Sequence, residues 1–400
     1  MSAVAARPGQ SLAGDFLIDH DRPPRRALDR WATELSGELA APGAASPLST
    51  EGRGAKAARM NLAALVVAYA GDLETAERLC RLQLEWLARL ASESGDASLL
   101  GDALQPWINL GRLRVLRGDV DGARPHFLLA EHLRDLRPVR LGPCNLPADA
   151  WPLVVAADPS IPEVLWNVYA IDQLKAYLRA GDPGGAPGFV SRLRRLAPPD
   201  VHRFIDEGEI LALLRGGYAE RALEKTADAD PATTADEMAF LLHRVAALVA
   251  LGQDGPARQL AVGLTAIVTR EEPLYATPPT FLRQLKRLAL LLEALDAEGY
   301  ALAVHARGLD VCDSYEDEPL HLEFIEGALR LAPGHRASAG WRSARARLLG
   351  RSLYFEVRRR YGLAANPGHV SIRELVAAVE SAVQGRPAPA TGRHDAGGPA

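Results

Sequence analysis

The residue pattern best suited to chemistry is a Glu-x-x-His pair, Glu318 and His321, which is followed by Glu323 and Glu326. Helical bundles hold di-iron centres with two such pairs, one on each of two helices. A second pair is not found in the sequence. We therefore expect no metal and no cofactor, and Glu318 and His321 remain weak metal candidates.

The usual signatures of nucleophilic or phosphate chemistry are missing from the sequence. It has no Gly-x-Ser-x-Gly elbow, no phosphate-binding Gly-x4-Gly-Lys-Ser/Thr loop and no Gly-x-Gly-x-x-Gly after a strand. Cys80, Cys144 and Cys312 are too far apart for a disulfide framework or a close-spaced zinc motif, and Cys80 is expected to be a buried structural thiol. Packing or surface positions are also expected for three histidines: His126, His132 and His243. These features favour a protein that performs no chemistry.

The composition is that of an ordinary globular protein. The chain has 400 residues, of which 48% are apolar and 24% charged, with a net charge of -4. The longest apolar stretch, Leu62 to Ala70, is under half of the roughly 20 residues that a spanning helix needs, and residues 1–30 lack the apolar run of a signal peptide. We therefore expect a cytoplasmic protein that does not interact with membranes.

The elements that would position any functional residue are helices. Leu, Ala and Val recur at three- and four-residue spacing, strand signals are nearly absent, and the fold class is therefore predicted to be all-α. The expected central helices are 60–70, 74–91, 104–117, 120–134, 164–180, 203–215, 219–228, 236–251, 255–269, 280–295 and 300–312. Further helices are expected at 24–39, 318–332, 339–361 and 372–384.

Five of the short turns between these helices place Gly five residues before Ala. The pairs are Gly71 and Ala76, Gly118 and Ala123, Gly181 and Ala186, Gly217 and Ala222, and Gly252 and Ala257. Glycine can end a helix with positive φ, and a small alanine lets the next helix cross closely. The last two alanine separations, 36 and 35 residues, are close to the 34-residue period of a helix-turn-helix repeat.

One unit, residues 104–134, resembles the tetratricopeptide repeat family. Its matching residues are Trp107, Leu110, Gly111, Gly118, Ala123, Phe127 and Ala130. The resemblance covers roughly residues 57–310 and departs from the family pattern where Arg114 takes an aromatic position. It implies an α-solenoid of stacked helix-turn-helix repeats with a C-terminal helical cap. A generic α-solenoid or a tetratricopeptide-like bundle remains an alternative.

The family resemblance also implies a concave groove that binds a protein or peptide. The groove would be lined by the first helix of each pair, with these residues: Ile108, Asn109, Arg112, Val115, Ile171, Lys175, Glu207, Leu211, Leu242 and Ala246. Few of them are cations, so a carboxylate clamp for chain termini is not expected.

The predicted organisation has four parts. Residues 1–55 form an N-terminal tail with one helix and a linker, 56–312 the repeat array, 313–385 the C-terminal cap and 386–400 a disordered tail. The array is interrupted at 136–165 by a Pro-rich insert in which we expect no helix, because prolines occur at high density. This insert would be either a lid or partner-binding loop, or a packed surface insertion.

The function expected from these features is that of a non-catalytic scaffold or adaptor for a protein or peptide. Two alternatives remain: a regulatory protein that responds to a ligand or peptide, and an accessory enzyme with a pocket under the 136–165 insert. A nucleic-acid partner is not expected, because only four of the 46 basic residues are lysine while alanine numbers 69. This bias is typical of a GC-rich bacterium and makes arginine clusters weak signals of nucleic-acid binding.

Overall fold

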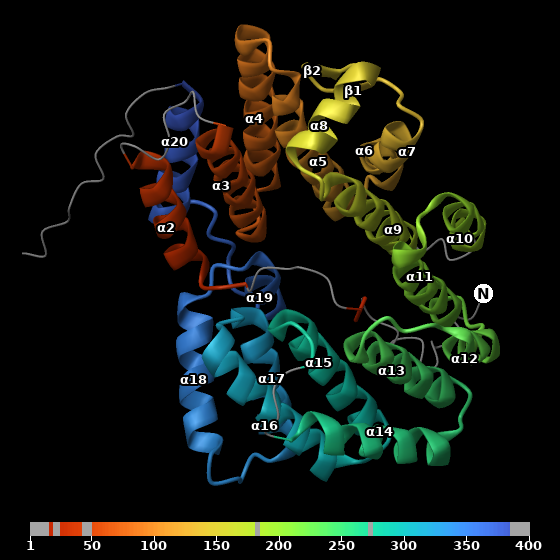
Figure 1. Ribbon diagram of the computed structural model, residues 1–400. Coiled ribbons are helices and arrows are strands. Elements are labelled where there is room, and N and C mark those ends of the chain that lie inside the picture. Colours follow the sequence, from red (N-terminus) through yellow and green to blue (C-terminus); the bar gives the residue numbers. More distant parts are fainter. Residues whose placement is uncertain (1–15, 19–24, 42–49, 181–184, 271–274, 385–400) are drawn as a thin grey trace, which may run out of the picture. The chain divides into compact units, whose positions relative to one another are not determined.

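The computed structural model describes residues 16–18, 25–41, 50–180, 185–270 and 275–384. They divide into two compact units, which are described separately below. Unit 1 comprises the described residues within 1–26, 114–130 and 162–352, and unit 2 those within 27–113, 131–161 and 353–400. Helices dominate both units, which agrees with the predicted all-α class (Figure 1).

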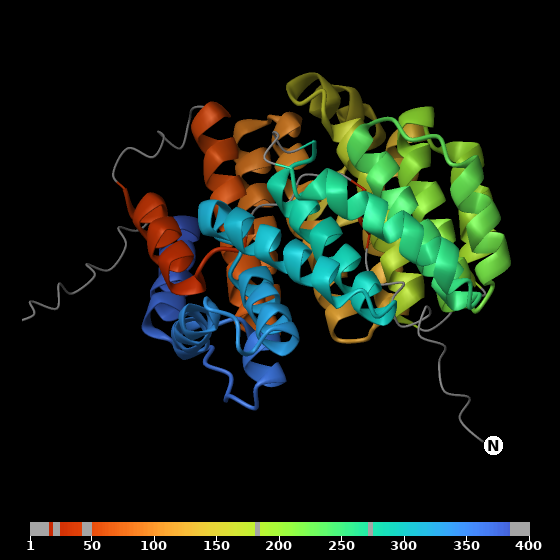
Figure 2. The same ribbon diagram turned by 90° about the horizontal axis from the view of Figure 1, so that it is seen from below.

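Unit 1 is a series of helices in which sequence neighbours pack together. From α10 to α18 each helix contacts the next, and α11, α13, α15 and α17 also contact one another in series. The bounds are α6 (Val120–Phe127), α9 (Ile161–Arg179), α10 (Gly185–Leu196), η3 (Pro199–Val201), α11 (His202–Arg215), α12 (Ala219–Asp228), α13 (Thr234–Ala250), α14 (Asp254–Val268), α15 (Pro278–Ala294), α16 (Glu298–Tyr315), α17 (Glu318–Leu331) and α18 (Ser338–Arg351). Figure 2 gives a second view of these helices. Every second helix from α11 to α17 therefore lies beside the next one in that series.

The predicted Gly–Ala turns explain how successive helices pack. Gly71, Gly118, Gly217 and Gly252 have positive φ, and Gly181 lies outside the described residues. All five alanines are fully buried: Ala76, Ala123, Ala186, Ala222 and Ala257. A left-handed glycine ends one helix, and the buried methyl group of alanine fits the close contact beyond the turn.

Unit 2 brings together segments from near both ends of the chain. Helix α20 contacts α2, α3 and α4. The bounds are α2 (Leu28–Ala40), α3 (Thr50–Tyr69), α4 (Leu73–Ser94), η1 (Ala97–Ala103), α5 (Leu104–Leu116), α7 (Leu129–Arg134), β1 (Val139–Leu141), β2 (Cys144–Leu146), η2 (Ala148–Ala150), α8 (Trp151–Ala157), α19 (Phe355–Arg360) and α20 (Val370–Gln384). Helices α5, α7 and α9 each have residues in both units. The structure thus divides the segment 313–385, expected as one cap, between unit 1 and unit 2.

The 136–165 insert is folded, and the expectation that it contains no helix is wrong. Strands β1 and β2 form an antiparallel hairpin, which η2 and α8 follow. Pro152 lies in the first turn of α8, where a missing N–H costs no intrahelical hydrogen bond. Trp151 is fully buried and donates from Nε1 to the Arg137 carbonyl (2.9 Å), while the Cys144 thiol donates to the Leu84 carbonyl of α4 (3.1 Å). These contacts show a packed insertion in the part of the insert that belongs to unit 2.

Two further boundaries differ from expectation. The helix expected at 339–361 is interrupted, because Ser352 takes an extended backbone conformation at the end of α18. Tyr354 is then buried in unit 2, with its ring centroid 6.0 Å from that of Tyr69. Helix α3 begins at Thr50, inside the expected linker, and residues 16–18 of the expected tail are buried. The predicted tail 386–400 lies outside the described residues.

Candidate functional site

Most residues predicted to line an open groove are buried. Seven of them have exposed fractions below a tenth: Ile108, Asn109, Ile171, Glu207, Leu211, Leu242 and Ala246. The other three, Arg112, Val115 and Lys175, are partly exposed. Asn109 and Arg112 contact each other in unit 2, where the Arg112 guanidinium donates to Asn109 Oδ1 (3.3 Å). Burial of seven of the ten residues differs from the exposure expected of groove-lining side chains, and in unit 1 residues Phe16–Ile18 lie against part of this set.

The three residues Phe16, Leu17 and Ile18 are buried in unit 1. Their exposed fractions are 1%, 2% and 0%. They make hydrogen bonds to α11 and α15, and Figure 1 shows them as a short red stretch close to α13. We call Lys175, Glu207, His243 and Gln284 the segment site. Lys175, Glu207 and Gln284 contact Phe16–Ile18 directly, and His243 contacts Glu207.

Glu207 of α11 is the centre of the segment site. Its carboxylate accepts hydrogen bonds from two successive main-chain N–H groups, those of Leu17 and Ile18, the latter at 3.2 Å. His243 of α13 lies 2.8 Å from Glu207 Oε1 through Nε2. Main-chain N–H groups can only donate, so the carboxyl oxygens accept from Leu17 and Ile18. The carboxylate form of Glu207 has no proton to donate, and the His243 tautomer that matches it carries its proton on Nε2. Three donors thus compensate a carboxylate with no exposed surface.

Gln284 of α15 holds the carbonyl side of the segment. Its Nε2 donates to the carbonyl oxygens of Leu17 (3.0 Å) and Ala235 (2.9 Å). Its Oε1 accepts from the hydroxyl of Tyr275 (3.2 Å), and burial raises the pKa of that phenol, which keeps it protonated. Hydrogen bonds at both Nε2 and Oε1 therefore fix the orientation of the Gln284 side-chain amide.

The ring of Phe16 is accommodated by α9 and α11. The Lys175 ammonium lies 5.5 Å from the ring centroid, a cation–π distance. A Cβ atom at Gly208 would lie 3.3 Å from Phe16 Cζ and 2.2 Å from Leu174 Cδ1. Glycine at 208 therefore leaves the space that both apolar side chains need.

A second contact holds the chain at Arg25. The main-chain N–H of Arg25 donates to Asp317 Oδ2 (3.3 Å), and its Nε lies 3.7 Å from Asp317 Oδ1. The Glu318 N–H donates to the Arg25 carbonyl (3.0 Å), and Asp317 also caps α17 by accepting from Leu320 N–H (3.1 Å). Asp317 therefore both caps α17 and holds Arg25.

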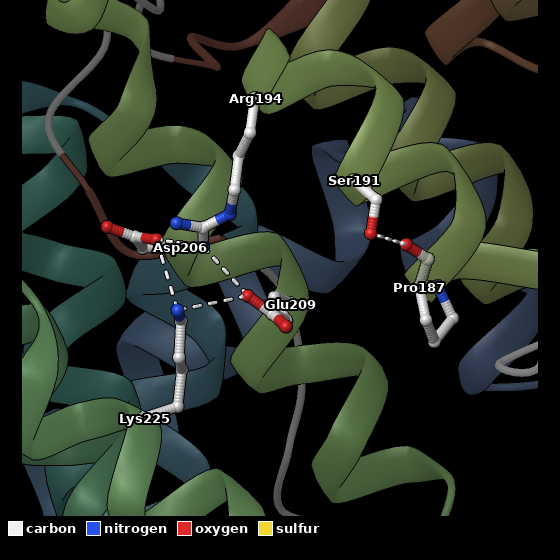
Figure 3. A network of polar contacts seen from close by, with 6 residues as sticks. All are labelled: Pro187, Ser191, Arg194, Asp206, Glu209 and Lys225. Carbon is white, nitrogen blue, oxygen red and sulfur yellow. Dashed lines mark hydrogen bonds and ion pairs between the residues drawn. The ribbon is translucent and has the colours of Figure 1, made fainter.

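The other side of α11 carries a network of ion pairs (Figure 3). Arg194 of α10 contacts both Asp206 and Glu209, the latter at 2.7 Å. Lys225 of α12 lies 3.3 Å from Glu209 and 3.9 Å from Asp206. Beside it is a small pocket of about 200 Å³, lined by Pro187, Val190, Glu209, Ala212, Leu213, Tyr218 and Arg221. The network ties α10, α11 and α12 together and pairs two carboxylates with two cations.

The weak metal candidates are not arranged as a metal site. His321 Nε2 lies 3.7 Å from Asp313 Oδ1, and burial lowers the pKa of His321. Among the described residues, no group of three or more His, Cys, Asp or Glu side chains could hold a metal ion, and this includes Glu318. The thiol of Cys80 is buried as predicted, and burial raises its pKa to about 12.

Sequence reasoning found part of the segment site and missed the rest. Glu207 and Lys175 were placed correctly on helices that face the segment, but as lining of an open groove. His243 was expected to be a packing histidine, and Gln284 and Phe16–Ile18 were not singled out. A usable signal was present: Lys175, Glu207, His243 and Gln284 are polar residues on apolar helices, at separations of 32, 36 and 41 residues.

Comparison with known proteins adds no identification. No known family model matches the chain, and a search of curated proteins finds no significant relative. In the described part of the chain, no helix is both long and apolar enough to cross a membrane.

Proposed function

We propose that the chain is a non-catalytic adaptor whose segment site binds an extended piece of a protein or peptide. The observation that supports this proposal is the bidentate contact of buried Glu207 with two successive main-chain N–H groups. Contacts to the main chain supply affinity for a polypeptide whatever its side chains are, while neighbouring apolar pockets select the side chains. No such arrangement is needed for a purely structural helix contact.

We further propose that unit 1 is an α-solenoid of tetratricopeptide-like helix pairs. Two features support this interpretation: the series of contacts among α11, α13, α15 and α17, and the glycine turns followed by buried alanines. The segment site takes one residue from each of α9, α11, α13 and α15. A stack of repeats would present its first helices side by side in this way.

The two alternatives lack comparable support. A pocket under the 136–165 insert would require space that Trp151 and Cys144 occupy in unit 2. No contact in the described residues distinguishes a ligand-responsive regulator from an adaptor. The main-chain contacts of Glu207 therefore favour an adaptor over the two alternatives.

Affinity purification of the tagged full chain, followed by mass spectrometry, tests the proposal. The variants Lys175→Glu and Glu207→Gln are compared with the wild type and with Glu209→Gln, which lies on the same helix but in the ion-pair network. We expect at least one protein that is recovered with the wild type and with Glu209→Gln and is lost with the other two. Recovery of the same proteins with all four chains would refute the proposed binding site.

A further inference from the structure

We infer that Phe16–Ile18 is an internal occupant of the segment site, and that an extended apolar segment of a partner protein displaces it. This inference rests on the proposed function. It adds a regulatory contact, because the chain's own residues compete with the partner, and it defines the kind of partner that the site fits.

The contacts of the segment main chain explain why another polypeptide could take its place. Leu17 and Ile18 offer two N–H groups to Glu207, and Leu17 offers its carbonyl to Gln284. Every extended segment with two successive residues other than proline has the same three groups. A partner that replaces Phe16–Ile18 therefore restores all three hydrogen bonds.

The chemistry of Glu207 also favours an occupant. With Phe16–Ile18 in place its side chain has no exposed surface, and the two main-chain N–H groups occupy the positions where water would otherwise bind. With the segment removed, His243 would be the one remaining donor among the contacts described above. An emptied site would have to take up water to replace the two main-chain donors, whereas a new polypeptide occupant supplies the same donors directly.

The surroundings of the side chains define the sequence of the partner. All three side chains of the internal segment are apolar and buried. The first is aromatic, lies near the Lys175 ammonium and fits against Gly208. An aromatic ring at the first position keeps the cation–π contact with Lys175, and burying a charge at the second or third position costs free energy, so we expect an aromatic residue followed by two aliphatic residues.

The chain can release Phe16–Ile18 without losing its second attachment. Arg25 is held by Asp317 and by the Glu318 N–H, neither of which takes part in the segment site. A segment tethered in this way has an effective concentration on the order of millimolar, which a free partner must overcome. The internal segment therefore raises the partner concentration needed for binding. The site then selects partners that bind it with high affinity.

The test is a binding measurement with a defined peptide. A fluorescein-labelled peptide with the sequence of residues 11–21, SLAGDFLIDHD, is titrated with the full chain, and its anisotropy is followed. Ile18→Pro in the full chain removes one N–H donor and weakens the internal occupant. We expect this variant to bind the peptide at least about tenfold more tightly than the wild type does, because competition at millimolar effective concentration is reduced.

Matched controls identify the site. Adding Glu207→Gln to Ile18→Pro should abolish the binding, whereas adding Glu209→Gln should leave it unchanged. A peptide with proline in place of Ile18 should bind at least about tenfold more weakly, because it lacks one N–H donor. Circular dichroism and thermal unfolding establish that each variant is folded, and Phe16→Ala replaces Ile18→Pro if the latter is not.

The outcomes separate the two proposals. Equal peptide affinity in the wild type and in Ile18→Pro, lost in both on Glu207→Gln, would overturn the internal occupant and leave the binding site intact. Absence of saturable binding to every folded variant would overturn the proposed function as well. A wild-type chain that is dimeric by light scattering, and that becomes monomeric with Ile18→Pro, would assign the segment to a second copy and overturn the inference.

Discussion

Helix α11 presents three carboxylates within four residues, and their surroundings differ sharply. Glu207 has no exposed surface and is bound by two main-chain N–H groups and His243. Asp206 and Glu209 have side chains that are 12% and 21% exposed, and they are bound by Arg194 and Lys225 (Figure 3). The side of the helix, and not the type of residue, decides which partners each carboxylate has.

This difference has an energetic consequence. Solvent screens a partly exposed ion pair, and holding two long side chains in one geometry costs conformational entropy. A buried carboxylate lacks that screening, so loss of its fixed donors, or loss of the carboxylate itself, leaves polar groups without partners. The comparison therefore predicts large effects at the segment site and small effects in the ion-pair network.

The largest effect is expected for Glu207→Ala. It leaves the N–H groups of Leu17 and Ile18 and Nε2 of His243 without their acceptor, and it should lower the free energy of unfolding by about 3 kcal/mol. Chemical denaturation with far-ultraviolet circular dichroism measures this change. The matched control, Glu209→Ala, should cost less than about 1 kcal/mol. Equal losses in the two variants would remove the distinction between the two sides of α11.

A smaller loss is expected for Gly208→Ala. The added methyl group would lie 2.2 Å from Leu174 Cδ1 and 3.3 Å from Phe16 Cζ, so one of these side chains must move. Overpacking of this kind costs about 1–3 kcal/mol. Gly188 in α10 has nothing within 4 Å of the same position, and Gly188→Ala should raise stability by up to about 1 kcal/mol. Thermal unfolding should show opposite shifts for the two variants, and shifts of the same sign would contradict the packing at Gly208.

The smallest effect is expected for Arg194→Gln. Arg194 is one-third exposed, and its loss leaves Lys225 beside both carboxylates. The free energy of unfolding should fall by less than about 1 kcal/mol. In 1 M NaCl the Debye length is only about 3 Å, so the difference from the wild type should shrink further. A loss that is large and independent of salt would show that the network acts as a buried structural unit.

Local sequence patterns were sufficient for the helices and their turns. Gly217 and Ala222 illustrate this, because positive φ at the glycine and full burial of the alanine follow from local chemistry. The same kind of reasoning could have found α8, since Pro152 is compatible with a first helical turn. Patterns within one or two turns of chain thus carry most of the fold class.

The segment site could not be derived in the same way. Leu17 and Glu207 are 190 residues apart in sequence, and three apolar residues in a Gly- and Pro-rich tail give no period. Glu207 and Lys175 could be assigned to the first helices of pairs, but burial of Glu207 depends on what packs over it. Only the three-dimensional contacts show that this cover is the chain's own Phe16–Ile18.

Amide hydrogen exchange of Leu17 and Ile18 tests the central claim most directly. If Glu207 holds these two N–H groups, their exchange in the wild type should be at least about a hundredfold slower than in a free chain. Glu207→Gln should remove this protection, and Glu209→Gln should keep it. Exchange of both amides at the rate of a free chain in the folded wild type would contradict the account.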